Sequence, residues 1–153
     1  MKNITTWQSK MRFESSDGEH SAVMDAPAPF GDGKALSPKQ LLLASICGCT
    51  GIDVVARMRK HRQAVTKLII EADAPKREGK PSTFDSVTLD YFFEGVLEAT
   101  KVIEAVVSSQ TEDCGVSAMI AAHCPVYYRV HLNGDLLKEG RSEFGVKNPR
   151  QSE

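Results

Sequence analysis

A nearly uncharged segment at residues 41–56 constrains the fold more than any other part of this sequence. It begins LLLASICGCT and contains one charged residue, Asp53. The preceding residues 37–40 (SPKQ) predict a helix start, because serine caps a helix, proline suits its first position and glutamine completes a capping box. A helix that is apolar nearly all round is buried on most sides. We therefore expect a central helix, ending near His61, that a sheet or a partner subunit covers.

This segment is not expected to cross a membrane. Its charge-free run, residues 40–52, is shorter than the roughly 20 apolar residues that a transmembrane helix needs. The first twenty residues contain no apolar stretch typical of a signal peptide. We therefore expect a cytoplasmic protein whose four cysteines stay mostly reduced and form no structural disulfide framework.

Length and charge narrow the functional classes. A chain of 153 residues, 41% of them apolar, can bury one core, so we expect one domain over residues 1–137 and a polar tail over residues 138–153. The net charge of −1 provides no basic surface for nucleic acid. Basic residues cluster at positions 57–62, where we expect a solvated helix end, because cations favour the negative end of the helix dipole.

The other segments show strand and helix patterns in turn. Strands are predicted over residues 4–14, 20–26, 65–74, 84–94 and 126–132, and helices over residues 97–109 and 113–122. The loop at residues 26–38 has three prolines and includes Phe30, and its length suggests that it lines a site. The order β-β-α-β-β-α-α-β is an α+β pattern.

The cysteines need separate interpretations. Cys47 and Cys49 are two residues apart in the expected helix, so their side chains point to nearly opposite sides and can neither pair nor share a metal ion. Cys47 and Cys124 are best explained as small buried apolar residues. Cys49 lies one turn before Asp53, and a buried carboxyl group near a thiol often marks a site.

Cys114 is the most sensible redox partner for Cys49. It lies near the start of the expected helix at 113–122, where a helix N-terminus makes a thiolate more available. The residues alone leave two alternatives open: the two cysteines form a redox pair, or they only pack. No metal site is expected from the cysteine and histidine spacings.

Two motifs resemble the OsmC/Ohr family of hydroperoxide-reducing proteins. They are SPKQLLLASICGCTGIDVV at residues 37–55 and SSQTEDCGVSAM at residues 108–119. The first is most similar to an OsmC-like branch whose central helix reads G-C-[ST]-x-I-D-V-V. The resemblance implies an α+β OsmC-like fold, in which antiparallel sheets wrap around two long central helices in an intertwined homodimer with its active sites at the interface.

The resemblance also implies roles for individual residues. Cys49 matches the peroxidatic cysteine, whose thiolate attacks the O–O bond of an organic or inorganic hydroperoxide, and Cys114 matches the resolving cysteine. A small dithiol or lipoyl-type reductant then reopens the disulfide, and the family reaction needs no cofactor or metal. Asp53, Phe30 and Lys39 are candidate binding residues that line the site.

The sequence departs from the family at two charged positions. Family members carry a glutamate ten residues before the reactive cysteine, where this chain has Lys39. They also place an arginine in the N-terminal hairpin loop, but residues 15–21 (SSDGEHS) contain none, and Arg12 lies just before them. A thiolate without its cationic partner is less activated. We expect a thiol-dependent peroxidase, with a non-catalytic OsmC-like dimer that binds a small molecule or senses oxidants as the alternative.

Overall fold

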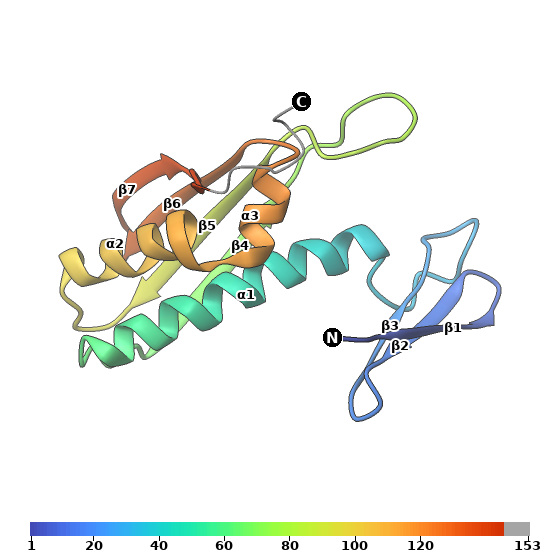
Figure 1. Cartoon of the computed structure of the whole chain (residues 1–153), viewed down its shortest axis with the longest axis horizontal. Helices are drawn as coiled ribbons and strands as arrows, with labels where there is room; N and C mark the ends of the chain where they lie inside the picture. Colours follow the sequence, from blue (N-terminus) through green and yellow to red (C-terminus); the bar gives the residue numbers. More distant parts are fainter. Residues whose placement is uncertain (146–153) are drawn as a thin grey trace. The chain divides into compact units, whose positions relative to one another are not determined.

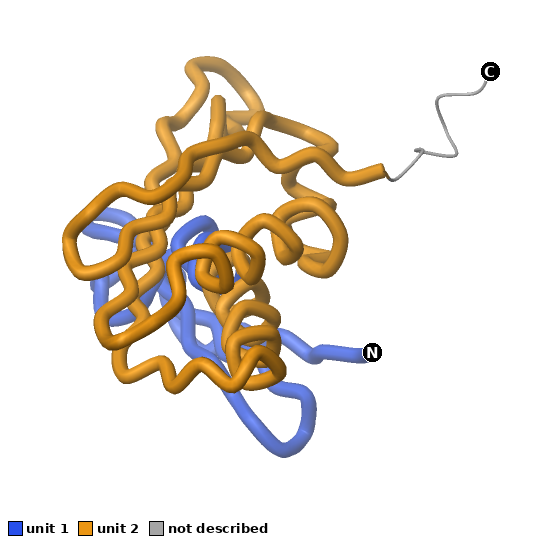
Figure 2. The backbone as a smooth tube through the Cα atoms, turned by 90° about the vertical axis from the view of Figure 1, so that its left-hand side faces the viewer, with its two compact units in different colours: residues 1–45 blue, residues 46–153 orange. Residues whose placement is uncertain are grey.

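The structure is a computed structural model that describes residues 1–145. The chain divides into two compact units at the junction of Ser45 and Ile46 (Figure 2). This junction lies inside the long helix α1 (Pro38–Lys60), which contributes residues to both units. The organisation of residues 1–137 as one domain stays a prediction.

The N-terminal unit contains a three-stranded antiparallel sheet, one strand more than predicted. Its strands are β1 (Ile4–Ser9), β2 (Arg12–Ser16) and β3 (Ser21–Met24). The single strand expected over residues 4–14 is wrong, because the chain turns at Lys10, which has a left-handed φ of 46°. The indole Nε1 of Trp7 donates to the Lys10 carbonyl at 2.9 Å and closes this turn.

The loop after β3 is organised around the buried carboxylate of Asp25. This carboxylate accepts hydrogen bonds from the backbone N–H groups of Ala26, at 2.8 Å, and of Asp32 and Lys34, both at 3.2 Å. Phe30 lies at the outside of the loop and is 73% exposed. The loop therefore has a fixed backbone with an exposed aromatic side chain.

Helix α1 begins at the predicted capping box. The Ser37 amide donates to Gln40 Oε1 at 2.8 Å, and the Gln40 amide donates to Ser37 Oγ at 3.4 Å. One face of the helix is buried, through Ile46, Thr50, Val54 and Met58. These residues recur every fourth position, as one helical face requires.

Two large apolar side chains of α1 are exposed within the described residues. Leu42 is 43% exposed and Ile52 is 73% exposed. By length and composition alone the whole helix is long and apolar enough to cross a membrane. This criterion is weak, since core helices of soluble proteins meet it too, but only 22% of the helix's apolar window is buried here. Part of the apolar surface of α1 is thus exposed within the described residues.

The second unit contains a four-stranded sheet in the order β4-β5-β6-β7 (Figure 1). Its strands are β4 (Lys67–Asp73), β5 (Val87–Glu94), β6 (Val126–Leu132) and β7 (Asp135–Arg141). β5 and β6 run parallel, so the expectation of purely antiparallel sheets is wrong here. A parallel pair needs a crossover connection, and the segment between β5 and β6 supplies it.

This crossover contains α2 (Ala99–Ser108), a π-helical turn η1 (Ser109–Asp113) and α3 (Gly115–Ala121). Both α2 and α3 contact β6, and Figure 1 shows them lying along the sheet. The sequence predicted the two α-helices but not the π-helical turn between them. The described residues therefore form the α+β architecture that was predicted, with two sheets and three α-helices.

Strand β7 replaces the start of the predicted polar tail. After the turn at Asn133 and Gly134, whose φ values are 52° and 93°, it pairs antiparallel with β6 up to Arg141. Most of its side chains are exposed, which explains why its sequence resembled a tail. Residues 146–153 of the predicted tail lie outside the described residues.

Candidate functional site

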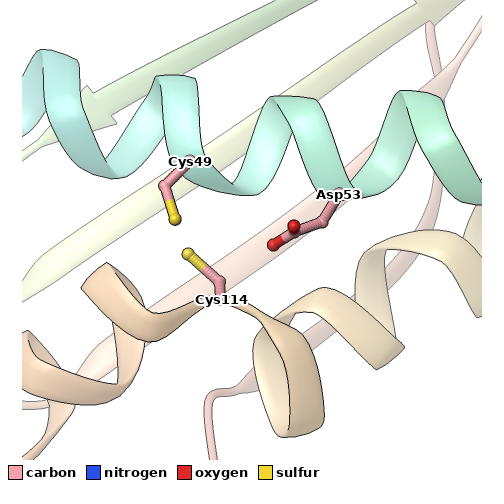
Figure 3. A group of neighbouring side chains, drawn as sticks. All are labelled: Cys49, Asp53 and Cys114. Carbon is pink, nitrogen blue, oxygen red and sulfur yellow. The ribbon is translucent and has the colours of Figure 1, made fainter.

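Two cysteines and one aspartate converge in the second unit. The sulfurs of Cys49 and Cys114 and a carboxylate oxygen of Asp53 all lie within 4.8 Å of one another (Figure 3). Cys49 and Asp53 are one turn apart on α1, and Cys114 approaches from the start of α3. The structure therefore brings together three of the residues that the sequence singled out as candidates.

The backbone around Cys114 fixes the position of its sulfur. The π-helical turn ends at Asp113, and the Cys114 amide donates to the Ser109 carbonyl at 3.0 Å. Cys114 then caps α3, with its Sγ accepting from the Ser117 amide at 3.4 Å. A sulfur thus takes the place of the oxygen that usually caps a helix. π-Helical turns within helices are frequent at functional sites.

A buried chain of hydroxyl groups leads to Asp53. Tyr91 OH and Thr50 Oγ1 are 2.7 Å apart, Thr50 Oγ1 and Ser109 Oγ are also 2.7 Å apart, and Ser109 Oγ donates to Asp53 Oδ2 at 3.1 Å. Each hydroxyl has one proton, and an ionised carboxylate can only accept. The chain is therefore oriented, with Tyr91 donating to Thr50 and Thr50 donating to Ser109.

Gln110 completes this network from the π-helical turn. Its Nε2 donates to Thr50 Oγ1 at 3.0 Å and to Tyr91 OH at 2.8 Å, and its Oε1 accepts from Ser142 Oγ at 2.7 Å. Thr50, Tyr91 and Gln110 are fully buried. The network therefore joins α1, β5, the π-helical turn and the residue that follows β7, and it holds the turn that presents Cys114.

Burial makes the two thiols unequal. Cys114 is 1% exposed, whereas Cys49 is half-buried. Burial raises the pKa of Cys114 to about 11, the neighbouring Cys49 adds to the rise, and hydrogen bonds from Ser117 oppose it. The Cys114 side chain is therefore a neutral thiol at neutral pH.

Burial also raises the pKa of Asp53 and is the largest effect on it. The hydrogen bond from Ser109 is the next largest effect and lowers this pKa. The negative charge of Asp113 raises this pKa further, and the positive charge of Arg57 lowers it. Asp53 is thus an acid that is easier to protonate than a solvated aspartate.

Arg57 connects α1 to the residues immediately before Cys114. Its Nε donates to Asp113 Oδ2 at 2.8 Å, and its Nη2 lies 2.7 Å from the same oxygen and 3.5 Å from Glu112 Oε2. Its side chain is 27% exposed, so the interpretation as a solvated helix end is wrong for this residue. Two features of the sequence could have indicated this ion pair. Arg57 stands one turn after Asp53, and two acidic residues precede Cys114.

The remaining candidates lie outside this cluster. Cys47 is half-buried and Cys124 is buried, and burial is the largest cause of the raised pKa of each thiol. Phe30 and Lys39 belong to the N-terminal unit, and their roles in binding stay predictions. Arg12 also lies in that unit, where its Nε donates to Gln8 Oε1 at 2.9 Å.

Comparisons with known proteins agree with this architecture. The family model for "OsmC-like protein" matches residues 31–129. Protein YhfA of Escherichia coli K12 is 33% identical over 123 residues, which cover 78% of this chain and 89% of YhfA. The crystal structure of a hypothetical protein from Aquifex aeolicus VF5 has a TM-score of 0.78 at 25% identity, covering 86% of this chain and 95% of that one.

A more distant structural relative shares the fold. It is an organic hydroperoxide resistance protein OsmC from Legionella pneumophila, with a TM-score of 0.63 at 16% identity, covering 86% of this chain and 94% of that one. The family-model match spans more than half of the sequence, and the match to YhfA covers more than two thirds of it. This chain therefore belongs to the OsmC-like protein family.

Proposed function

We propose that this protein is a thiol-dependent peroxidase that reduces organic or inorganic hydroperoxides with Cys49 and Cys114. The observation that carries the proposal is the convergence of two free sulfurs and a carboxyl group within 4.8 Å. The fold shared with an organic hydroperoxide resistance protein from Legionella pneumophila supports it.

The difference in exposure supports the proposed order of the two thiols. Cys49 is the more accessible sulfur, so its thiolate attacks the terminal oxygen of the hydroperoxide. The O–O bond breaks, the alkoxide leaves and takes up a proton as the alcohol, and Cys49 becomes a sulfenic acid. Cys114 then attacks the Cys49 sulfur, water leaves, and a disulfide forms. A small dithiol or lipoyl-type reductant restores both thiols by exchange.

Asp53 is the proton carrier of the proposed reaction. Its carboxylate lies close to both sulfurs and can accept the proton that Cys49 loses. Because burial raises its pKa, the protonated acid can then supply the proton that the departing alkoxide needs. The hydrogen bond from Ser109 holds one carboxylate oxygen, which keeps the carboxyl group oriented.

The apolar face of α1 fits both a homodimer and an organic substrate. Leu42 and Ile52 lie on the same stripe of the helix as Cys49 and are exposed within one chain. In the proposed homodimer a second copy covers this stripe, and the remaining apolar surface beside Cys49 contacts the organic group of the peroxide. The proposal places the dimer in the cytoplasm, where dithiol reductants are maintained.

The test is peroxide consumption by the reduced protein. Cumene hydroperoxide and hydrogen peroxide are supplied with dithiothreitol or dihydrolipoamide, and the remaining peroxide is measured over time. Cys49→Ser is expected to abolish consumption, whereas the control Cys47→Ser keeps it. Cys114→Ser is expected to form a Cys49 sulfenic acid that dimedone traps. Consumption that persists unchanged in Cys49→Ser would sink the peroxidase proposal.

A second candidate function is non-catalytic sensing or small-molecule binding. It is favoured by Lys39, which stands where family members carry their glutamate, and by the hairpin loop that lacks their arginine. In the same assay a sensor would oxidise once per chain and show no turnover with either reductant. Sustained turnover with either reductant would exclude this candidate.

A further inference from the structure

We propose that Cys49, Asp53 and Cys114, when reduced, bind one divalent metal ion of the zinc class, and that forming the disulfide releases it. Metal binding goes beyond the proposed peroxidase and does not depend on it. The cysteine and histidine spacings alone predicted no metal site in this chain. The three residues that the fold brings together make a different set of ligands.

The donor atoms and their spacing suit zinc. Zinc prefers four tetrahedral ligands, with Zn–S distances of about 2.3 Å and Zn–O distances of about 2.0–2.2 Å. Neighbouring ligand atoms around such an ion are therefore roughly 3.3–3.8 Å apart. The two sulfurs and the carboxylate oxygen already lie within 4.8 Å of one another, so small side-chain movements suffice. Three protein ligands also leave the fourth position open to water or a substrate.

Two features of the fold hold the donors in place. Cys49 and Asp53 are four residues apart on α1, a spacing that presents both side chains on one helical face. The Asp53 carboxylate receives a hydrogen bond from Ser109 at Oδ2, which leaves Oδ1 for the ion. Ser109 is itself fully buried and bonded to Thr50. Outer hydrogen bonds of this kind orient metal ligands and tune their affinity.

Ser117 holds the sulfur of Cys114 in place. Ser117 is fully buried and belongs to the same helical turn as Cys114, whose sulfur accepts from the Ser117 amide at 3.4 Å.

The charges around the cluster also favour a cation. Metal binding displaces the protons of both thiols, after which the three ligands carry three negative charges between them. Arg57, one turn further along α1, donates to Asp113 and lies near Glu112, so acidic groups already balance its charge. A divalent ion offsets the repulsion among the three ligands.

The same sulfurs cannot hold a metal and form a disulfide together. A hydroperoxide, or another two-electron oxidant, takes two electrons from the metal-bound thiolates. With an organic hydroperoxide and two protons, the products are the disulfide, an alcohol, water and the free divalent ion. If the protein has the proposed peroxidase activity, zinc and peroxide compete for the same two sulfurs. Only this competition depends on the proposed function.

The test measures metal binding without peroxide. Reduced full-length protein in metal-free buffer is titrated with Zn²⁺ by calorimetry, and Co²⁺ serves as a spectroscopic probe of sulfur ligation. We expect one ion per chain for the reduced protein and none after diamide has formed the disulfide, as checked by mass spectrometry. Cys49→Ser should abolish binding, and Ser109→Ala should weaken it by about 10–100-fold. Cys47→Ser and Cys124→Ser are matched controls that keep it.

Two results would overturn the inference: zinc binding that is unchanged in Cys49→Ser, or binding that survives disulfide formation. Circular dichroism of each variant excludes loss of fold as the cause of lost binding. A protein that reduces peroxide but binds no zinc refutes only the metal site. A protein that binds zinc in this pattern without reducing peroxide refutes only the proposed peroxidase.

Discussion

At the scale of single residues, the two thiols differ more than their shared cluster suggests. Cys49 is half-buried on α1, three residues before the exposed Ile52, whereas Cys114 is 1% exposed and directly follows the π-helical turn. A buried thiol with a high pKa is a poor first nucleophile for a peroxide, because the thiolate is the reactive form. It can still attack a sulfenic acid that forms on Cys49, because the short distance between the two sulfurs compensates for the low fraction of thiolate.

The pH dependence of Cys114 alkylation tests this difference. Its pKa is raised to about 11, so its thiolate fraction should increase about tenfold per pH unit between pH 7 and pH 10. Iodoacetamide labelling of Cys114, followed by mass spectrometry, should therefore accelerate by the same factor. In Cys49→Ser the profile should shift to lower pH, because Cys49 contributes to the raised pKa. A plateau below pH 9 in the wild-type protein would contradict the assignment.

Asp53→Asn should slow peroxide reduction without removing either thiol. The amide cannot accept the Cys49 proton or return it to the alkoxide, and such proton transfers contribute about 10²–10⁴-fold to enzymatic rates. The measurement is kcat/KM for cumene hydroperoxide. Asp53→Glu keeps the carboxyl group and should recover part of the rate. Equal rates for the wild type and Asp53→Asn would rule out a role for this carboxyl group in proton transfer.

At the scale of elements, the π-helical turn depends on side chains far from it in sequence. Gln110 bonds to Thr50, Tyr91 and Ser142, which lie on α1, on β5 and after β7. Without these bonds, nothing local in the segment SQTED favours a π-helix over an α-helix. The element that presents Cys114 is therefore specified by tertiary contacts.

Gln110→Ala should destabilise the protein by about 1–3 kcal/mol, because it leaves the buried Ser142 hydroxyl without its acceptor and removes the bonds to Thr50 and Tyr91. The free energy of unfolding is measured with urea. The same variant should form the Cys49–Cys114 disulfide more slowly after a peroxide pulse, because the turn is no longer held. Lys101→Ala, on the surface of α2, is the control and should change stability by less than about 0.5 kcal/mol. Unchanged stability of Gln110→Ala would show that the network does not hold the turn.

Elements with local signals were predictable from the sequence. The helix start at α1 is predicted by the capping box at residues 37–40. Strand β5 is predicted by the alternation of Val87, Leu89, Tyr91 and Phe93. The turn at Lys10 gave no such signal, because lysine rarely takes a left-handed φ. Strand β7 was missed because an exposed edge strand can carry the polar residues of a tail.

The candidate site was predictable only in part, for a similar reason. Helical periodicity places Cys49 near Asp53, and the second family motif points to Cys114. Thr50 and Ser109 are 59 residues apart in the sequence, and each looks like an ordinary small polar residue inside a helix. Their partnership depends on packing between elements, which periodicity does not describe. Arg57 was assigned to a solvated helix end because its acidic partners lie 55 and 56 residues away.

At the scale of the whole molecule, the apolar side chains of α1 that are exposed within the described residues need an explanation. An apolar stripe containing Leu42 and Ile52 is unfavourable in water and favourable at an interface. The family resemblance predicts that a second copy of the chain covers this stripe in a homodimer. The oligomeric state therefore bears directly on the environment of Cys49, which lies on the same stripe.

The protein should behave in solution as a dimer with twice its 16.7 kDa chain mass, and Ile52→Asp should dissociate it. Burying an isoleucine contributes about 1.5–3 kcal/mol, and a symmetric interface contains two copies. Replacing both with aspartate should therefore weaken the dimer by roughly 100-fold or more. Light scattering coupled to size exclusion measures the mass across a dilution series. Val96→Asp is the matched control, because Val96 is a fully exposed apolar residue outside α1 and its replacement should leave the dimer intact. A wild-type protein that elutes as a monomer at every concentration would refute the homodimer, and α1 would then need a different partner.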